Sequence, residues 1–287
     1  MLTPENYICA VGDSFVFGAE LVTTHFGSEF QNVSAEEYHR LEYEVSLNKE
    51  AYSRYYKLLD SMRFSSLVAK TLGALHINYA QGGASQEGIK FQTYLLLDTL
   101  TKKNIDLANT TWLVGLTSPF RQLHQFNEQK EWHRMKSKIT GDENYVWSRT
   151  TVCTIFADRL EQNIQVYSPS FIKELISKKT ESIIYLQWAM NILDVHKILS
   201  AAGVGKIVFL NIFSTEHFKF TGLADLPMAE LLANLLSEVP VYPSKFVDLG
   251  EYVNQNLPNR AGYCKYGHFN ELGNKLIAEY LLNTVLK

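Results

Sequence analysis

The sequence predicts an α/β protein with a mostly parallel sheet in a three-layer, doubly wound arrangement. Three short β-branched or aromatic runs have the continuous apolar character of buried parallel strands: Tyr7 to Val11, Thr111 to Leu116 and Lys206 to Ile212. Helical stretches separate these runs, and such alternation is typical of a parallel sheet covered on both faces. Since crossovers between parallel strands are right-handed, the order favours the doubly wound topology.

The remaining elements complete this pattern. A weaker strand is predicted over Leu75 to Ala80. Gly203 suits the C-terminal cap of the predicted helix that ends at Ala202. The predicted helices are Tyr52 to Leu72, Gly88 to Lys102, Ser182 to Ala202 and an amphipathic final one, Asn274 to Leu286. In such folds the ligand lies at the carboxyl ends of the strands, so we expect the site there.

We expect a single domain over residues 1–287, with two insertions near 28–50 and 121–180. The first insertion, Ser28 to Glu50, is acidic, and we interpret it as a partly helical segment with a solvated face rather than a metal cluster. The second, Arg121 to Thr180, is aromatic and mixed in charge. It could be a lid that contacts substrate or a helical elaboration packed on the edge of the core.

Composition excludes several classes of function. The 27 Lys and Arg residues and 30 Asp and Glu residues give a net charge of −3, which offers no basic surface for nucleic acid or anionic membranes. The three cysteines show no zinc or disulfide spacing, and phosphate-loop, dinucleotide and zincin motifs are absent. With no export signal seen, we expect a cytoplasmic protein that needs no cofactor and no metal, and whose partner is a small molecule or glycan.

Ser14 is the candidate nucleophile. It follows the first predicted strand in Gly12-Asp13-Ser14, where a strand-to-helix turn would place its hydroxyl near outward-facing backbone N–H groups. A serine hydroxyl needs a base to take its proton. Gly, Asp and Ser are also ordinary turn and cap residues, so this motif alone is a weak signal. Asp13 is expected to support the turn rather than to transfer a proton.

His268 is the candidate base. It lies in a loop just before the final predicted helix, within Tyr266-Gly267-His268-Phe269-Asn270. The unperturbed pKa of histidine lies close to neutral pH, which suits a general base. The competing interpretation is a surface or capping histidine.

Together these blocks resemble the SGNH or GDSL hydrolases, which have a flavodoxin-like three-layer fold. Val11 to Gly18 matches the first block, with Ser14 at the position of the nucleophile, and His268 falls on the catalytic histidine. Asn78 to Ser85 matches the second block, which places Gly83 on the glycine whose N–H helps form the oxyanion hole, with Gly82 as a near competitor. The resemblance implies that Ser14 also donates its N–H there.

Two positions depart from the pattern of the family. Thr117 stands where the third block has an asparagine, so the resemblance assigns the third oxyanion donor to a threonine hydroxyl, which is shorter. Lys265 stands where the fourth block has the aspartate that orients the histidine. A backbone carbonyl, Asp248 or Glu271 could replace that acid.

The sequence therefore predicts a serine-dependent carboxylic-ester hydrolase, and the resemblance implies that its substrates are small acyl esters, including O-acetyl groups on glycans. The alternative is a non-catalytic protein of the same fold that binds a glycan or a protein partner, which the two departures would permit. A nucleotide-binding doubly wound domain is a third hypothesis, and it lacks a phosphate loop.

Overall fold

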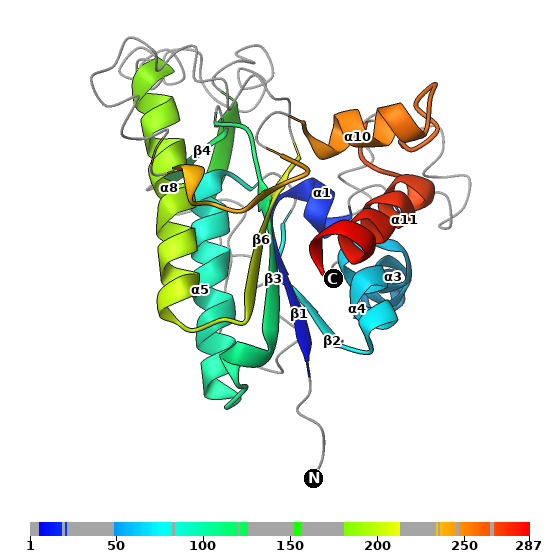
Figure 1. Ribbon diagram of the computed structural model, residues 1–287, viewed down its shortest axis with the longest axis horizontal. Helices are drawn as coiled ribbons and strands as arrows, with labels where there is room; N and C mark the ends of the chain where they lie inside the picture. The colour runs from blue at the N-terminus through cyan, green and yellow to red at the C-terminus, as the bar shows by residue number, and fades with distance from the viewer. Residues whose placement is uncertain are drawn as a thin grey trace.

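The computed structural model has a parallel sheet between two layers of helices (Figure 1). It describes residues 6–18, 21, 49–81, 84–119, 121–125, 152–156, 181–212, 234, 236–244, 247–264 and 267–287. The five strands run in the order β2-β1-β3-β6-β7, and every neighbouring pair is parallel. Their bounds are β1 (Tyr7–Val11), β2 (Leu75–Asn78), β3 (Thr110–Leu116), β6 (Lys206–Asn211) and β7 (Val241–Tyr242). The predicted three-layer, doubly wound class is confirmed.

Two helices cover one face of the sheet: α5 (Gln86–Lys102) and α8 (Glu181–Ala201). Alternate residues of β1, Cys9 and Val11, are buried against this layer together with Trp112 of β3. Side chains of a strand point to opposite faces in turn, so the neighbours Ile8 and Ala10 enter the other core. β1, β3 and β6 are therefore apolar on both faces, which explains their continuous apolar runs.

The second face is covered by helices from both ends of the chain (Figure 1). Apart from Leu59 and Met62, which form a small cluster of their own with Leu21, their buried apolar residues share one cluster with β1, β3 and β6. They are α1 (Ser14–Phe17), α3 (Lys49–Met62), α4 (Phe64–Leu72), α10 (Leu249–Asn256) and α11 (Glu271–Tyr280), which continues as a π-helical turn, η4 (Leu281–Val285). The predicted helix Tyr52 to Leu72 is thus two helices, because Arg63 has an extended backbone between them.

The second predicted insertion includes a separate antiparallel pair of strands, β4 (Arg121–Gln125) and β5 (Val152–Phe156). Residues 126–151 and 157–180 of this insertion, and 28–48 of the first, lie outside the described residues. The division into one domain with two insertions therefore stays a prediction. None of the described helices has the length and apolar character needed to cross a membrane.

The direction in which the chain adds strands to the sheet reverses between β1 and β3. After β1 the chain returns to β2 on one side, whereas β3, β6 and β7 extend the sheet on the other. Crossovers that leave in opposite directions open a crevice at the carboxyl ends of these two strands, where doubly wound folds bind ligands. Asp13 follows β1 and Thr117 follows β3, so the first and third sequence blocks meet there.

Candidate active site

Asp13 builds the turn that begins with the candidate nucleophile. Its carboxylate Oδ1 accepts a hydrogen bond from the Phe15 amide at 3.0 Å, and its carbonyl accepts from the Phe17 amide at 2.9 Å. Asp13 is therefore the N-cap of α1, whose first residue is Ser14. This is the supporting role expected from the sequence.

Gly12, which follows β1, and Gly115 of β3 allow α1 to lie close to the sheet. A Cβ atom on Gly12 or on Gly115 would overlap Val16 Cγ2, and a Cβ atom on Gly115 would also lie 2.9 Å from Ile212 Cδ1. Val16 is fully buried over the two strands. The glycine of Gly12-Asp13-Ser14 is thus required by the close approach of the helix that follows it.

Thr117 is held on three sides at the end of β3. Its amide donates to Gln86 Oε1 at 3.2 Å, its carbonyl accepts from Trp188 Nε1 at 2.7 Å, and its hydroxyl donates to Asp13 Oδ2 at 3.2 Å. Its single hydroxyl hydrogen is directed at a carboxylate. The structure therefore gives Thr117 a role in joining β3 to the turn after β1, and the predicted oxyanion contact of its hydroxyl stays a prediction.

His268 lies next to the residue that follows Ser14. The His268 and Phe15 rings are 4.8 Å apart between centroids, with an interplanar angle of 49°, and the Phe269 ring is 5.1 Å from that of Phe15. These contacts bring the first and last sequence blocks together although 254 positions separate Ser14 from His268. The predicted base and the predicted nucleophile turn therefore share one edge of the sheet.

Backbone bonds fix the loop that carries His268. The His268 carbonyl accepts from the Cys264 amide at 2.7 Å, and Asn270 caps α11 by accepting from the Gly273 amide at 3.0 Å. Asn274 is buried and spans two elements, because it donates to the Phe269 carbonyl and accepts from the Phe64 amide, both at 3.0 Å. The loop is therefore tied to α4 as well as to α11.

Asp248, one of the groups predicted to orient His268, is the N-cap of α10 in the structure. Its Oδ1 accepts from the Glu251 amide at 2.6 Å. Burial, reinforced by the charge of Glu251, raises the pKa of Asp248 above its ordinary value, against the lowering effect of the backbone hydrogen bonds. Glu271 is exposed at the start of α11, and Lys265 lies outside the described residues. The orienting group for His268 therefore stays a prediction.

Two glutamines of α5 bond to the ends of the central strands, and sequence reasoning missed both. Gln92 Oε1 accepts from the amide of Gly12, the residue that follows β1, at 2.9 Å. Gln86 Oε1 accepts in the same way from the amide of Thr117, the residue that follows β3. Both side chains are buried. Gln86 lies three positions after Gly83, and Gly82 and Gly83 are outside the described residues. The local sequence holds no signal for either bond, because the partners come from separate strands of the sheet.

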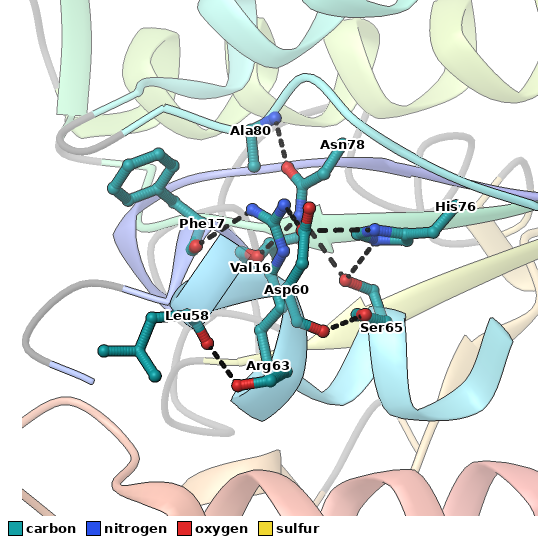
Figure 2. A network of polar contacts seen from close by, with 11 residues as sticks. Val16, Phe17, Leu58, Asp60, Arg63, Ser65, His76, Asn78 and Ala80 are labelled. Carbon is teal, nitrogen blue, oxygen red and sulfur yellow. Dashed lines mark hydrogen bonds and ion pairs between the residues drawn. The ribbon is translucent and has the colours of Figure 1, made fainter. Parts of the chain in front are cut away.

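Another group of serine, histidine and aspartate side chains lies beside α1 (Figure 2). His76 Nε2 is 3.0 Å from Ser65 Oγ, and its Nδ1 is 3.5 Å from Asp60 Oδ1. The order matches that of a hydrolytic triad. Ser65, however, has no exposed surface, and Asp60 also pairs with the guanidinium of Arg63. The Ser65 hydroxyl is also 3.4 Å from Asn78 Nδ2 (Figure 2), so the group belongs to a larger polar network and we interpret it as structural.

The same network holds the end of α1. Asn78 Nδ2 donates to the Val16 carbonyl at 3.0 Å, and Arg63 Nη1 donates to the Phe17 carbonyl at 3.4 Å (Figure 2). Asn78 Oδ1 accepts from the Ala80 amide at 2.8 Å. The last carbonyls of a short helix have no partner within it, and these donors supply one. α1 is thereby fixed to β2 and α4.

We expect Ser65→Ala to preserve any esterase activity and to lower stability. The change removes the hydroxyl oxygen that lies 3.0 Å from His76 Nε2 and 3.4 Å from Asn78 Nδ2. A buried polar group that loses its partner lowers the free energy of unfolding by about 1 to 3 kcal/mol. Urea unfolding and ester hydrolysis measure the two quantities. Loss of hydrolysis by a folded Ser65→Ala protein would identify this group as catalytic.

We expect the protein to lose stability in acid because of His76. Burial, followed by the charge of Arg63, lowers the pKa of His76 from 6.5 to about 3. Between these two pH values the unfolded chain binds one more proton at His76 than the folded protein does. The free energy of unfolding therefore decreases as the pH is lowered, by at most about 1.4 kcal/mol per pH unit from this group. Urea unfolding from pH 7 to pH 4 should show a shallower dependence in His76→Gln. Identical slopes would contradict this account.

Among the described residues, no group of three or more histidine, cysteine, aspartate or glutamate side chains could hold a metal ion.

Of the solved structures, 23 chains match this one, and two of them are described next. One is a member of the lipolytic G-D-S-L family from Veillonella parvula, with 10% identity, a TM-score of 0.42 and coverage of 98% of each chain. The other is a carbohydrate esterase whose active site displays divergent catalytic and non-catalytic binding functions, with 13% identity, a TM-score of 0.44 and coverage of 100% of this chain and 70% of that one. No protein-family model and no curated protein matches the sequence.

Proposed function

We propose that this protein is a serine-dependent ester hydrolase with Ser14 as the nucleophile and His268 as the general base. The observation that carries the proposal is the packing of His268 on Phe15, with 4.8 Å between ring centroids, which brings the histidine loop onto the turn that begins with Ser14. The turn lies at the carboxyl end of β1, beside the reversal of the sheet. A nucleophile and a base at this edge are the parts that acyl transfer needs.

The reaction proceeds in two steps. Ser14 Oγ attacks the ester carbonyl carbon while His268 takes the hydroxyl proton, and the histidine then gives this proton to the departing alcohol. Water next attacks the acyl-serine, with His268 again accepting a proton, and the carboxylic acid leaves as Ser14 regains its hydrogen. The oxyanion formed in each step is stabilised by backbone N–H groups, which we assign to Ser14 and Gly83.

The substrates we propose are small acyl esters, including O-acetyl groups on glycans. Neutral sugar esters suit a chain with a net charge of −3, which offers no general attraction to anionic polymers.

Two measurements on the purified protein test the proposal. An activated serine reacts with a fluorophosphonate probe, and hydrolysis of p-nitrophenyl esters and acetylated sugars gives the acyl preference. We expect labelling of one serine and release of acetate. A folded protein that neither reacts with the probe nor hydrolyses any ester would contradict the proposal, and glycan binding without hydrolysis would then identify a binding protein.

A further inference from the structure

We propose that the side-chain amide of Gln86 is a catalytic donor to the oxyanion, in place of the asparagine that Thr117 replaces. This inference rests on the proposed ester hydrolase function and adds a residue to its site. It starts from two observations, the engagement of the Thr117 hydroxyl and a buried amide donor beside it.

The Thr117 hydroxyl is directed at another group. It donates to Asp13 Oδ2 at 3.2 Å, and both side chains are buried. If the Thr117 hydroxyl donated to an oxyanion instead, Asp13 Oδ2 would lose this hydrogen bond. Losing a buried hydrogen bond lowers stability. A substrate oxygen at this position is better served by a second donor.

Gln86 supplies such a donor. Its Oε1 accepts from the Thr117 amide at 3.2 Å, which fixes the amide orientation because Nε2 has no lone pair to accept that hydrogen. Gln86 is 2% exposed, and its Nε2 has no acceptor in the part of the chain that the structure describes. Buried side-chain amides nearly always have partners, so an unused one calls for an explanation.

The position of this donor agrees with its proposed role. The N and O atoms of a carboxamide are about 2.2 Å apart, so Gln86 Nε2 lies within about 5.5 Å of the Thr117 amide nitrogen. A site shielded from water strengthens a hydrogen bond to a developing negative charge. The Gln86 side chain extends from α5 to the end of β3. It is longer than the side chain of the third-block asparagine, which would extend from the end of β3 itself.

The helix fixes the backbone of Gln86. Ser85 is the N-cap of α5 and accepts from the Gly88 amide at 3.1 Å, and Gln86 is the first residue of this 17-residue helix. The donor therefore starts from a rigid element, as electrostatic catalysis requires.

The test compares three variants with p-nitrophenyl acetate as substrate. Gln86→Glu keeps an oxygen to accept from the Thr117 amide and removes the N–H donor. Gln92→Glu is the matched control, since Gln92 lies on the same helix, has the same 2% exposure and also accepts from a backbone amide after a strand. Thr117→Val removes the threonine hydroxyl. Thermal unfolding and the fraction of folded protein are measured for each.

We expect Gln86→Glu to lower kcat by about a hundred-fold with little change in KM, the size of effect seen when one oxyanion donor is lost. Gln92→Glu and Thr117→Val should lower kcat less than ten-fold at equal folded fraction. Equal kcat losses in Gln86→Glu and Gln92→Glu, or a hundred-fold loss confined to Thr117→Val, would overturn the inference.

A crystal structure of the wild-type fluorophosphonate adduct gives a test that needs no variant. The expected result is Gln86 Nε2 within hydrogen-bond distance of the phosphonyl oxygen, and an oxygen bound by backbone N–H groups alone would overturn the assignment. A wild-type protein without esterase activity or labelling would instead refute the proposed function itself. The two failures are therefore distinguishable.

Discussion

Replacing Ser14 with alanine should lower kcat by about a million-fold, which is the loss measured when a serine hydrolase is deprived of its nucleophile. The fold should survive, because Asp13 caps α1 by accepting from the Phe15 amide. The rate of p-nitrophenyl acetate hydrolysis by the purified Ser14→Ala protein measures the effect, with thermal unfolding as the check on folding.

Ser65→Ala is the matched control, since it removes a serine hydroxyl that lies 3.0 Å from the Nε2 atom of His76. Wild-type kcat in the control and background rate in Ser14→Ala would assign the nucleophile. If Ser14→Ala keeps more than a few per cent of the wild-type rate, Ser14 is not the nucleophile and the reaction needs another group.

The strands could be predicted because both faces of the sheet are covered. Tyr7 to Val11 is apolar throughout, since its alternate residues enter two different cores, and its predicted bounds are those of β1. β7 escaped prediction because two residues, Val241 and Tyr242, carry no periodic signal. The break between α3 and α4 was missed because Arg63, which interrupts them, is a good helix former by propensity.

The supporting role of Asp13 in the turn was predicted because the turn belongs to one contiguous block, whereas contacts between side chains from separate elements were missed. Asp13 and its turn follow from one short motif. The bond from Thr117 to Asp13 and the donor on Gln86 depend on three elements meeting at the sheet edge, and nothing in the local sequence indicates which side chains face one another. The group of Ser65, His76 and Asp60 could be interpreted as structural only from its contacts in the structure.

His268→Gln should lower kcat nearly as much as Ser14→Ala does, by about a million-fold, because a serine hydroxyl without its base is a poor nucleophile. Glutamine is close to histidine in size, so the contact with Phe15 is kept in part, and the loop remains held by the backbone bond from Cys264. The free energy of unfolding should therefore change little while kcat collapses.

Nucleophile and base act as one unit, so their effects should not add. A Ser14→Ala, His268→Gln double variant is expected to hydrolyse p-nitrophenyl acetate no more slowly than either single variant, since each alone already removes the covalent step. Fluorophosphonate labelling of Ser14 should slow in His268→Gln for the same reason, because the probe also requires an activated hydroxyl. If His268→Gln keeps wild-type labelling and turnover, another group takes the serine proton, and the packing of His268 against Phe15 then serves only to join the last loop to the turn after β1.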